Sequence, residues 1–268
     1  MDPLKQLIAK MQTQSRTSEP MTQSTKVQCT KCNDTGWVYW TDENGYEMGA
    51  ICSCGIRERQ ILDGKLKFAS IPESFKDVSV ESFSTAYYLG QREKAEKAIK
   101  AVRTWLENFQ DMKEQGKGLY LYSTIKGSGK TRCVCGIAND IIRKHTILVK
   151  FSTSLQILQE IRSTWEKGGE SELIRDLIST PVLIIDDFGT EKVRDWITEK
   201  FYQIINERYL AKALTIFTSN MCIKDLDYDE RIISRVKEMC FEIPFPEESV
   251  REHISENAAR RFNIASGL

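Results

Sequence analysis

The sequence of 268 residues contains no run of about 18 consecutive apolar residues, which a membrane-spanning helix would need. Its first residues, Met-Asp-Pro-Leu-Lys, lack the apolar stretch of a secretory signal peptide. The chain also has no net charge, because 38 basic residues balance 38 acidic ones. These absences favour a cytoplasmic protein without a membrane partner, in which any contact with nucleic acid depends on a local patch of charge.

The composition, with 41% hydrophobic and 28% charged residues, is typical of a globular protein that has one large core and a small additional module. From residue 118 onward, short apolar segments alternate with helical ones. The expected strands are 118–123, 147–151, 182–185, 214–218 and 239–243, and the expected helices are 131–144, 154–165 and 195–210. This alternation indicates an α/β fold in which helices flank a parallel sheet.

A glycine-rich loop follows the first expected strand. The residues that we expect to bind the phosphates of a nucleotide are Gly127, Ser128, Gly129, Lys130 and Thr131. The glycines let backbone N–H groups surround the phosphates, Lys130 can reach the β and γ oxygens, and the Thr131 hydroxyl can ligate Mg²⁺. The usual pattern has a glycine where this chain has Thr124, so the entry to the loop must differ. The alternative is an ordinary Gly/Ser turn.

Polar residues follow two of the other expected strands. Asp186 and Asp187 end the apolar run 182–185, where Asp186 can hold the Mg²⁺ shell and Asp187 can polarise a water molecule. Asn220 follows the strand 214–218, where its amide could orient the attacking water or could belong to a simple turn. Ligands bind at the carboxyl ends of parallel strands, so we expect these groups to converge with the phosphate loop.

Four of the eight cysteines cluster as two pairs, Cys29-x-x-Cys32 and Cys52-x-Cys54. The segment between the pairs is typical of a β-hairpin, with a turn at residues 42–45. A hairpin would bring the four thiolates together as a tetrahedral Zn²⁺ site, which would stabilise a module too small for a core of its own. A redox pair or free thiols are the alternative. We expect the other four cysteines to pack in the interior.

Arginines near the end of the chain are candidates for charge stabilisation at a phosphate. Arg231 and Arg235 lie on one face of an expected helix, and Arg251 follows a proline-containing loop. An arginine delivered by a neighbouring subunit stabilises the charge that develops on phosphoryl oxygens during hydrolysis. A surface salt bridge with Asp229 or Glu230 is the competing interpretation.

The patterns divide the chain into three parts. Residues 1–25 combine apolar residues at helical spacing with a polar stretch, which predicts a short helix on a flexible linker that either docks on a partner or frays. Residues 26–66 would form the zinc module and its following helix. Residues 67–268 would form the nucleotide-binding domain.

The order of these motifs resembles that of the DnaC/DnaI-type replicative helicase loaders of bacteria and their phages. The resemblance covers residues 26–250 and rests on the Cys-x-x-Cys-Asn-Asp-Thr-Gly-Trp segment, the phosphate loop, Ile-Ile-Asp-Asp-Phe-Gly, Thr-Ser-Asn and Arg-Ile-Ile-Ser-Arg. It implies an AAA+ ATPase that uses ATP and Mg²⁺, assembles head-to-tail, and helps to place a DnaB-type ring helicase on single-stranded DNA.

The same resemblance assigns roles to individual residues. It makes Asn220 the sensor 1 residue, Arg231 the arginine finger acting in a neighbouring subunit, and Arg251 the sensor 2 residue. Asp187 stands where many AAA+ proteins carry glutamate, which implies a slow turnover. By analogy with the family, Phe151 and Thr153 are candidate contacts for single-stranded DNA. The aromatic residues of the hairpin are further candidates for DNA or for a partner.

Two other functions fit the same motifs. The related transposition ATPases share the ATPase motifs and bind DNA, although they generally lack the zinc module. A zinc-bearing adaptor that does not hydrolyse ATP is also compatible with the sequence, because Thr124 would lower the affinity of the loop for nucleotide.

Overall fold

The computed structural model describes residues 28–165, 170–191 and 194–266. The chain divides into two compact units, residues 1–59 and 60–268, and the division falls inside helix α2 (Ile56–Ala69). The amphipathic segment predicted at residues 1–25 lies outside the described residues. The three-part domain scheme therefore stays a prediction.

The first unit is built around the expected hairpin. Strand β1 (Trp37–Thr41) pairs antiparallel with β2 (Glu47–Ile51). The turn between them is closed by the Asp42 carboxylate, which accepts hydrogen bonds from the backbone N–H groups of Asn44 and Tyr46. Asp favours such a turn because its short side chain can bond the backbone a few residues later. The hairpin predicted from the sequence is confirmed.

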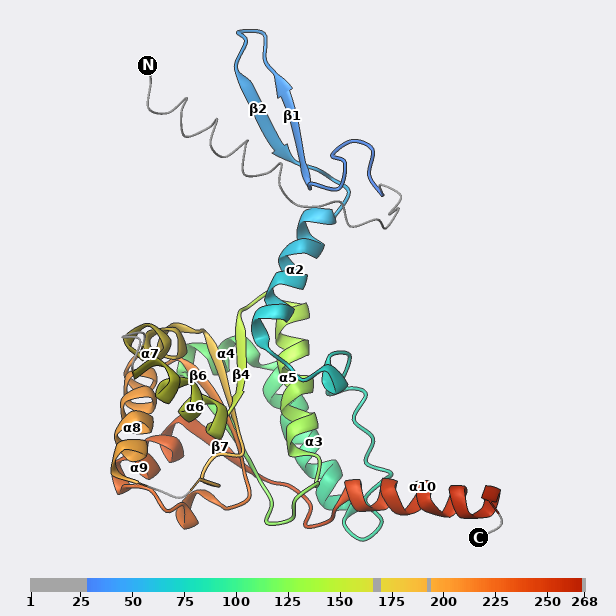
Figure 1. Ribbon diagram of the computed structural model, residues 1–268, viewed down its shortest axis with the longest axis vertical. Coiled ribbons are helices and arrows are strands. Elements are labelled where there is room, and N and C mark those ends of the chain that lie inside the picture. The colour runs from blue at the N-terminus through green and yellow to red at the C-terminus, as the bar shows by residue number, and fades with distance from the viewer. Residues whose placement is uncertain (1–27, 166–169, 192–193, 267–268) are drawn as a thin grey trace. The chain divides into compact units, whose positions relative to one another are not determined.

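The second unit contains a sheet of five parallel strands in the order β4-β5-β6-β3-β7. Figure 1 shows this sheet among the helices of the unit. The strands are β3 (Gly118–Tyr122), β4 (Val149–Thr153), β5 (Val182–Asp186), β6 (Leu214–Ser219) and β7 (Cys240–Pro244). β4 begins two residues later than predicted, because Thr146 ends the preceding helix in the left-handed region at φ 53°. The predicted α/β class with a parallel sheet is confirmed.

Helices connect these strands. They are α3 (Arg92–Glu107), α4 (Phe109–Gln115), α5 (Lys130–His145), α6 (Ser154–Trp165), α7 (Glu170–Ser179), α8 (Asp195–Leu210), α9 (Glu230–Met239) and α10 (Val250–Ser266), with 3₁₀ turns η1 (Glu73–Phe75) and η2 (Ile223–Asp225). Helices α5, α6 and α8 were expected from the sequence, whereas α3, α4, α7 and α10 were not. One face of α3 is buried in the interior and has the spacing of an amphipathic helix. Its buried residues are Ala95, Ala98, Ile99, Val102 and Trp105. The many charged residues of this segment hid that pattern in the sequence.

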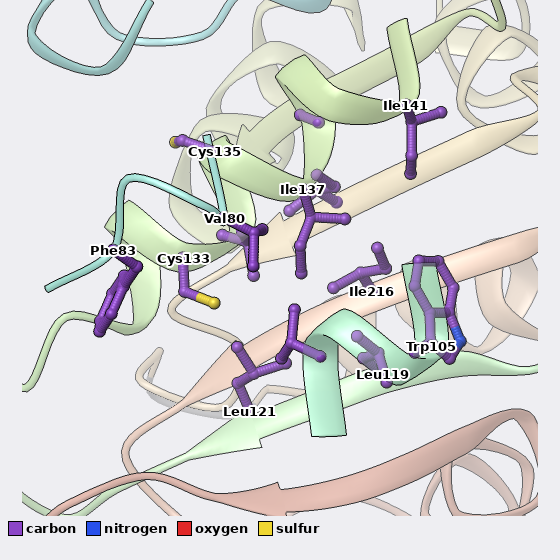
Figure 2. Close-up of a cluster of buried hydrophobic side chains, with 14 of the residues drawn as sticks. Val80, Phe83, Trp105, Leu119, Leu121, Cys133, Cys135, Ile137, Ile141 and Ile216 are labelled. Carbon is purple, nitrogen blue, oxygen red and sulfur yellow. The ribbon is translucent and has the colours of Figure 1, made fainter. Parts of the chain in front are cut away.

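Successive residues of each strand point to opposite sides of the sheet and enter two different apolar clusters. Leu119, Leu121 and Ile216 belong to the cluster that α3, α4 and α5 cover, and Figure 2 shows them packed with Ile137 and Ile141 of α5. Tyr120, Leu183, Ile185 and Phe217 belong to the cluster that α6, α7, α8 and α9 cover. Helices therefore flank both faces of the sheet, as predicted.

A fully buried arginine joins three elements of the second cluster. Arg208, near the end of α8, has no exposed surface. Its guanidinium donates to the carbonyl oxygens of Leu177, Ile178, Thr180 and Leu214 and to the hydroxyl of Thr215. Burial lowers its pKa to about 9. These partners include the last carbonyls of α7, where the helix dipole stabilises a cation.

The four cysteines outside the cluster differ in burial. Cys133, Cys135 and Cys240 are buried, as predicted, whereas Cys222 is half-buried and its thiol lies 2.8 Å from a carboxylate oxygen of Asp225. Among the described residues, no helix is both long and apolar enough to cross a membrane.

Candidate nucleotide site and cysteine cluster

The phosphate loop connects β3 to α5 at the carboxyl edge of the sheet. Gly127 and Gly129 have φ values of 82° and 89°, which side chains rarely adopt. A Cβ atom on Gly129 would also lie 2.7 Å from the hydroxyl of Tyr88, which donates to the Ser128 carbonyl oxygen. Glycine is thus required here by both the backbone conformation and the neighbouring ring.

Lys130 is the first residue of α5, and only 5% of its surface is exposed. Its ammonium donates to the carbonyl oxygens of Ser123 and Ile125, to the Ser128 hydroxyl, and to Oδ1 of Asn220 at 3.1 Å. Burial lowers the pKa of Lys130 against the opposing effect of nearby carboxylates. The ammonium is thereby held at the mouth of the loop, where phosphate oxygens would be its natural partners.

Asp186 ends β5 and is 3% exposed. Its carboxylate accepts hydrogen bonds from the Thr131 hydroxyl, 3.1 Å from each oxygen, and from the Thr218 hydroxyl at 2.5 Å. Burial, together with the adjacent Asp187 carboxylate, raises the pKa of Asp186 to about 6. A hydroxyl beside a buried carboxylate is the oxygen donor set that Mg²⁺ prefers, so Thr131 and Asp186 fit the metal role predicted for them.

Asp187 adopts a left-handed conformation at φ 54°. Its N–H donates to the Thr218 hydroxyl at 3.0 Å, and its carbonyl oxygen accepts from the hydroxyls of Ser154 and Thr190. Ser154 also donates to the Glu191 carboxylate. Hydroxyls from three segments therefore fix the backbone that presents the Asp187 side chain.

A cavity of about 500 Å³ opens between these groups. Its lining includes the phosphate loop residues, Asp187, Asn220 and, from the start of α10, Arg251. The structure thus brings together the predicted phosphate-binding residues, both candidate water-orienting residues and the predicted sensor 2 arginine. A cavity lined by the Lys130 ammonium and the Asp187 carboxylate is suited to a phosphate chain with its metal ion.

Arg231 is not part of the lining of this cavity. It follows the N-terminus of α9, where its guanidinium pairs with Asp229 at 2.9 Å and lies 4.6 Å from the ring centre of Tyr202. Arg235 is committed to contacts within the chain, with Asn206 and Tyr202. Of these two arginines, Arg231 is the more exposed, and its ion pair with Asp229 lies at the surface, which is compatible with a role at a neighbouring subunit.

The two candidate DNA contacts on β4 differ in accessibility. Phe151 is 4% exposed and packs in the cluster beside α5, so its ring has no free face for a base. We therefore assign Phe151 to the core. Thr153 is half-buried, and its hydroxyl lies 3.1 Å from the Gln156 side chain. Its contact with DNA stays a prediction.

The four clustered cysteines of the first unit converge. All four sulfur atoms lie within 4.8 Å of one another, with 3.8 Å between Cys29 and Cys52 and 3.7 Å between Cys32 and Cys54. A tetrahedral Zn²⁺ ion with Zn–S bonds of about 2.3 Å would place its sulfurs about 3.8 Å apart. Backbone N–H groups of Cys32 and Lys31 lower the pKa of Cys29 to about 7, which favours the thiolate that a metal requires. The geometry fits a zinc module.

Several residues around the nucleotide cavity were not predicted. Tyr88 bonds the loop, and Thr218 and Ser154 bond the two aspartates. Thr218 is part of the Thr-Ser-Asn motif, but no motif marks Tyr88 or Ser154. Glu247 contacts Thr124 across 123 positions of sequence. The one signal in the sequence was Thr124 itself, which stands where the usual motif has glycine and so indicated that the entry to the loop differs.

The chain matches the family model described as IstB-like ATP binding protein over residues 56–256. It is 26% identical over 223 residues to the Phage-like element PBSX protein XkdC of Bacillus subtilis, covering 81% of each chain. It is 28% identical to the Replicative helicase loader DnaI of the same organism, over 42% of this chain and only 36% of that protein. The Replicative helicase loader DnaC of Escherichia coli is 23% identical, over 71% of this chain and 77% of that protein.

Solved structures share the fold of the second unit. The DnaC helicase loader matches with a TM-score of 0.58 and 23% identity, over 65% of this chain and all of that one. The replication initiator DnaA bound to AMPPCP and single-stranded DNA matches with a TM-score of 0.54 and 22% identity, over 72% of this chain and 57% of that one. These similarities establish an AAA+ type of α/β fold.

Proposed function

Because the chain belongs to the family of IstB-like ATP binding proteins, we propose that it is an ATPase that loads a replicative ring helicase onto single-stranded DNA. The observation that carries the proposal is the single cavity that unites Lys130, Asp187, Asn220 and Arg251. Two curated relatives are named replicative helicase loaders, which supports the choice of partner. Their name favours loading over the transposition-type alternative, whereas the cavity fits both because the two groups share the ATPase motifs.

In the proposed reaction, each residue has one task. The loop N–H groups and Lys130 bind the phosphates, and Thr131 with Asp186 holds Mg²⁺, which supplies charge neutralisation when it is bound. Asp187 and Asn220 orient and polarise the attacking water. Arg251 contacts the phosphate chain from α10 of the same subunit, and hydrolysis is slow and stimulated by DNA.

Self-association in a head-to-tail oligomer forms part of the proposal. Arg231 would leave Asp229 and enter the cavity of a neighbouring subunit, where a bidentate guanidinium suits the developing charge on phosphoryl oxygens. ATP at the interface then stabilises the assembly, and its hydrolysis releases the helicase. Support comes from the exposed position of Arg231 and from its absence among the residues that line its own cavity.

Zn²⁺ held by Cys29, Cys32, Cys52 and Cys54 completes the proposed cofactor set. The sulfur distances support it. Elemental analysis of freshly purified, reduced protein should find about one zinc per chain. A metal-free but folded hairpin would contradict the assignment.

Co-purification with the host's replicative helicase, followed by an ATPase assay with and without single-stranded DNA, tests the function. Capture of a transposase instead of the helicase would favour the transposition ATPases, and absence of ATP binding with magnesium would favour the adaptor.

A separate experiment tests whether Arg231 acts in a neighbouring subunit, by mixing Arg231→Ala with Lys130→Ala protein. Each should be nearly inactive alone, and the mixture should regain part of the activity, because some interfaces then contain both intact halves. A flat activity profile in confirmed mixed oligomers would exclude the arrangement.

A further inference from the structure

The position where the phosphate loop lacks its usual first glycine is bound by an acidic residue from the other end of the domain. The backbone N–H of Thr124 lies 2.9 Å from a carboxylate oxygen of Glu247, and the N–H of Ile125 lies 3.2 Å from the same oxygen. The Thr124 hydroxyl also donates to it. One carboxylate therefore accepts from two successive backbone N–H groups and one hydroxyl at the entry of the loop.

Glu247 is held in place from the other side. It lies in the turn between β7 and α10, and its own backbone N–H and carbonyl oxygen both bond the side chain of Gln91, just before α3. In the same turn, the carbonyl oxygen of Pro246 accepts from the Ser123 hydroxyl. The carboxylate is thus presented to Thr124 by a turn that is fixed at two further points.

The segment that Glu247 binds also holds the Lys130 ammonium in place. The carbonyl oxygens of Ser123 and Ile125, on either side of Thr124, both accept from the Lys130 ammonium. A shift of the loop entry would move these two oxygens and with them the ammonium that is expected to meet the phosphates. The acceptor on Glu247 lies outside the lining of the nucleotide cavity, so it acts on the loop and not on the ligand.

The same turn contacts the centre of the loop. The N–H of Val250 donates to the Gly127 carbonyl oxygen at 3.1 Å. A Cβ atom on Gly127 would meet the Ser249 hydroxyl at 2.8 Å and Cβ of Arg251 at 3.0 Å. The segment from Glu247 to Arg251 therefore contacts the loop both at its entry and at Gly127, and the Glu247 carboxylate makes the contact at the entry.

We propose that Glu247 is a positioning residue for the phosphate loop, and that its pairing with Thr124 takes the place of the missing glycine. The proposal rests on the proposed function as an ATP-binding protein. A charged acceptor makes stronger hydrogen bonds than a neutral one, so the carboxylate holds the entry of the loop in one conformation before ATP arrives. Preorganisation of this kind raises affinity without a direct contact.

The test is the affinity of the full-length protein for ATP with Mg²⁺, measured by titration calorimetry. Glu247→Ala should weaken binding about tenfold, because three donors lose their acceptor and the loop entry loses its fixed conformation. Glu247→Gln keeps an acceptor oxygen and should stay within about threefold of the wild type. Thr124→Val, which removes only the hydroxyl, should weaken binding about threefold, and it should add nothing in the Glu247→Ala background.

Glu248→Ala is the matched control. The Glu248 carboxylate accepts from the backbone N–H groups of Leu89, Gly90 and Gln91 and thereby fixes the segment that precedes α3. Its loss should lower the melting temperature and leave the affinity for ATP unchanged. Equal affinity of wild type and Glu247→Ala, or multiplicative effects of Thr124→Val and Glu247→Ala, would overturn the positioning role. A wild type that does not bind ATP would instead overturn the proposed function.

Discussion

The two units of this chain are stabilised by different means. In the described part of the first unit, the buried apolar side chains are those of Cys32, Cys52 and Ile56, with few partly buried neighbours, and the strands of the hairpin are largely exposed. In the second unit, two large apolar clusters fill the space on both sides of the sheet. Burial of apolar surface can account for the folding of the second unit, whereas the hairpin has so little of it that the proposed Zn²⁺ ion on the four cysteines would have to stabilise it.

The largest predicted effect is the loss of the first unit without zinc. Removal of the metal by a strong chelator, or Cys52→Ser, should unfold the hairpin, because structural zinc contributes about 10–16 kcal/mol to modules of this kind. ATP affinity and the melting temperature of the second unit should not change. NMR spectra of the hairpin amides, recorded beside ATP titrations, would measure both. Cys222→Ser is the control, and a hairpin that stays ordered without zinc would contradict the comparison.

Arg208→Ala should destabilise the second unit and leave the first unit unchanged. It leaves four buried carbonyl oxygens without their donor, so it should lower the free energy of unfolding of the second unit by about 3 kcal/mol or more. Zinc content should remain the same. Denaturant unfolding would measure the change, and Arg175→Ala, at an exposed position on α7, should cost less than about 0.5 kcal/mol. Equal effects of the two substitutions would show that the buried contacts contribute nothing.

ATP with Mg²⁺ should stabilise only the second unit. At about 100 times the dissociation constant, the gain is about 2.7 kcal/mol, visible as a rise in melting temperature. Lys130→Ala should abolish the rise, because it removes a phosphate contact. Asp187→Asn should keep it and block hydrolysis, because it removes only a charge that polarises water. Loss of the rise in both variants would show that the roles of Lys130 and Asp187 are assigned wrongly.

The smallest effect is expected on the hairpin surface. Tyr39 is 71% exposed, so Tyr39→Ser should change the stability of either unit by less than about 0.5 kcal/mol. Phe217→Ala, at a fully buried position of β6, provides the contrast and should cost about 3–5 kcal/mol. Thermal unfolding of the zinc-loaded protein measures both. A large loss from Tyr39→Ser would mean that the aromatic side chains form a core of the first unit.

The sequence predicted most of what local patterns control. The bounds of α8 were predicted without error, and each strand of the sheet was found, because apolar runs between polar turns are local signals. α3 was missed because charged residues separate its five buried positions. In the site, the phosphate loop and the pair Asp186 and Asp187 were recognisable as motifs.

Contacts between distant segments were not predictable. Arg208 looks like any surface arginine at the end of a charged helix, and only the assembled structure shows the carbonyl oxygens of α7 around it. Phe151 was a candidate contact for DNA by analogy with the family, yet its side chain is 4% exposed and packs in the cluster beside α5. Which face a strand residue occupies depends on the register of the whole sheet.

The contact between Thr124 and Glu247 also bears on how this chain can change in evolution. Thr124 and Glu247 are 123 positions apart in the sequence, so a single mutation cannot create the same contact at another place. A relative that regains glycine at position 124 loses the hydroxyl donor and so relaxes selection on the acidic residue at position 247. A hydroxyl at position 124 and an acceptor at position 247 should therefore occur together in relatives. A chimera that takes position 124 from one relative and position 247 from another should lack the hydrogen bonds between them.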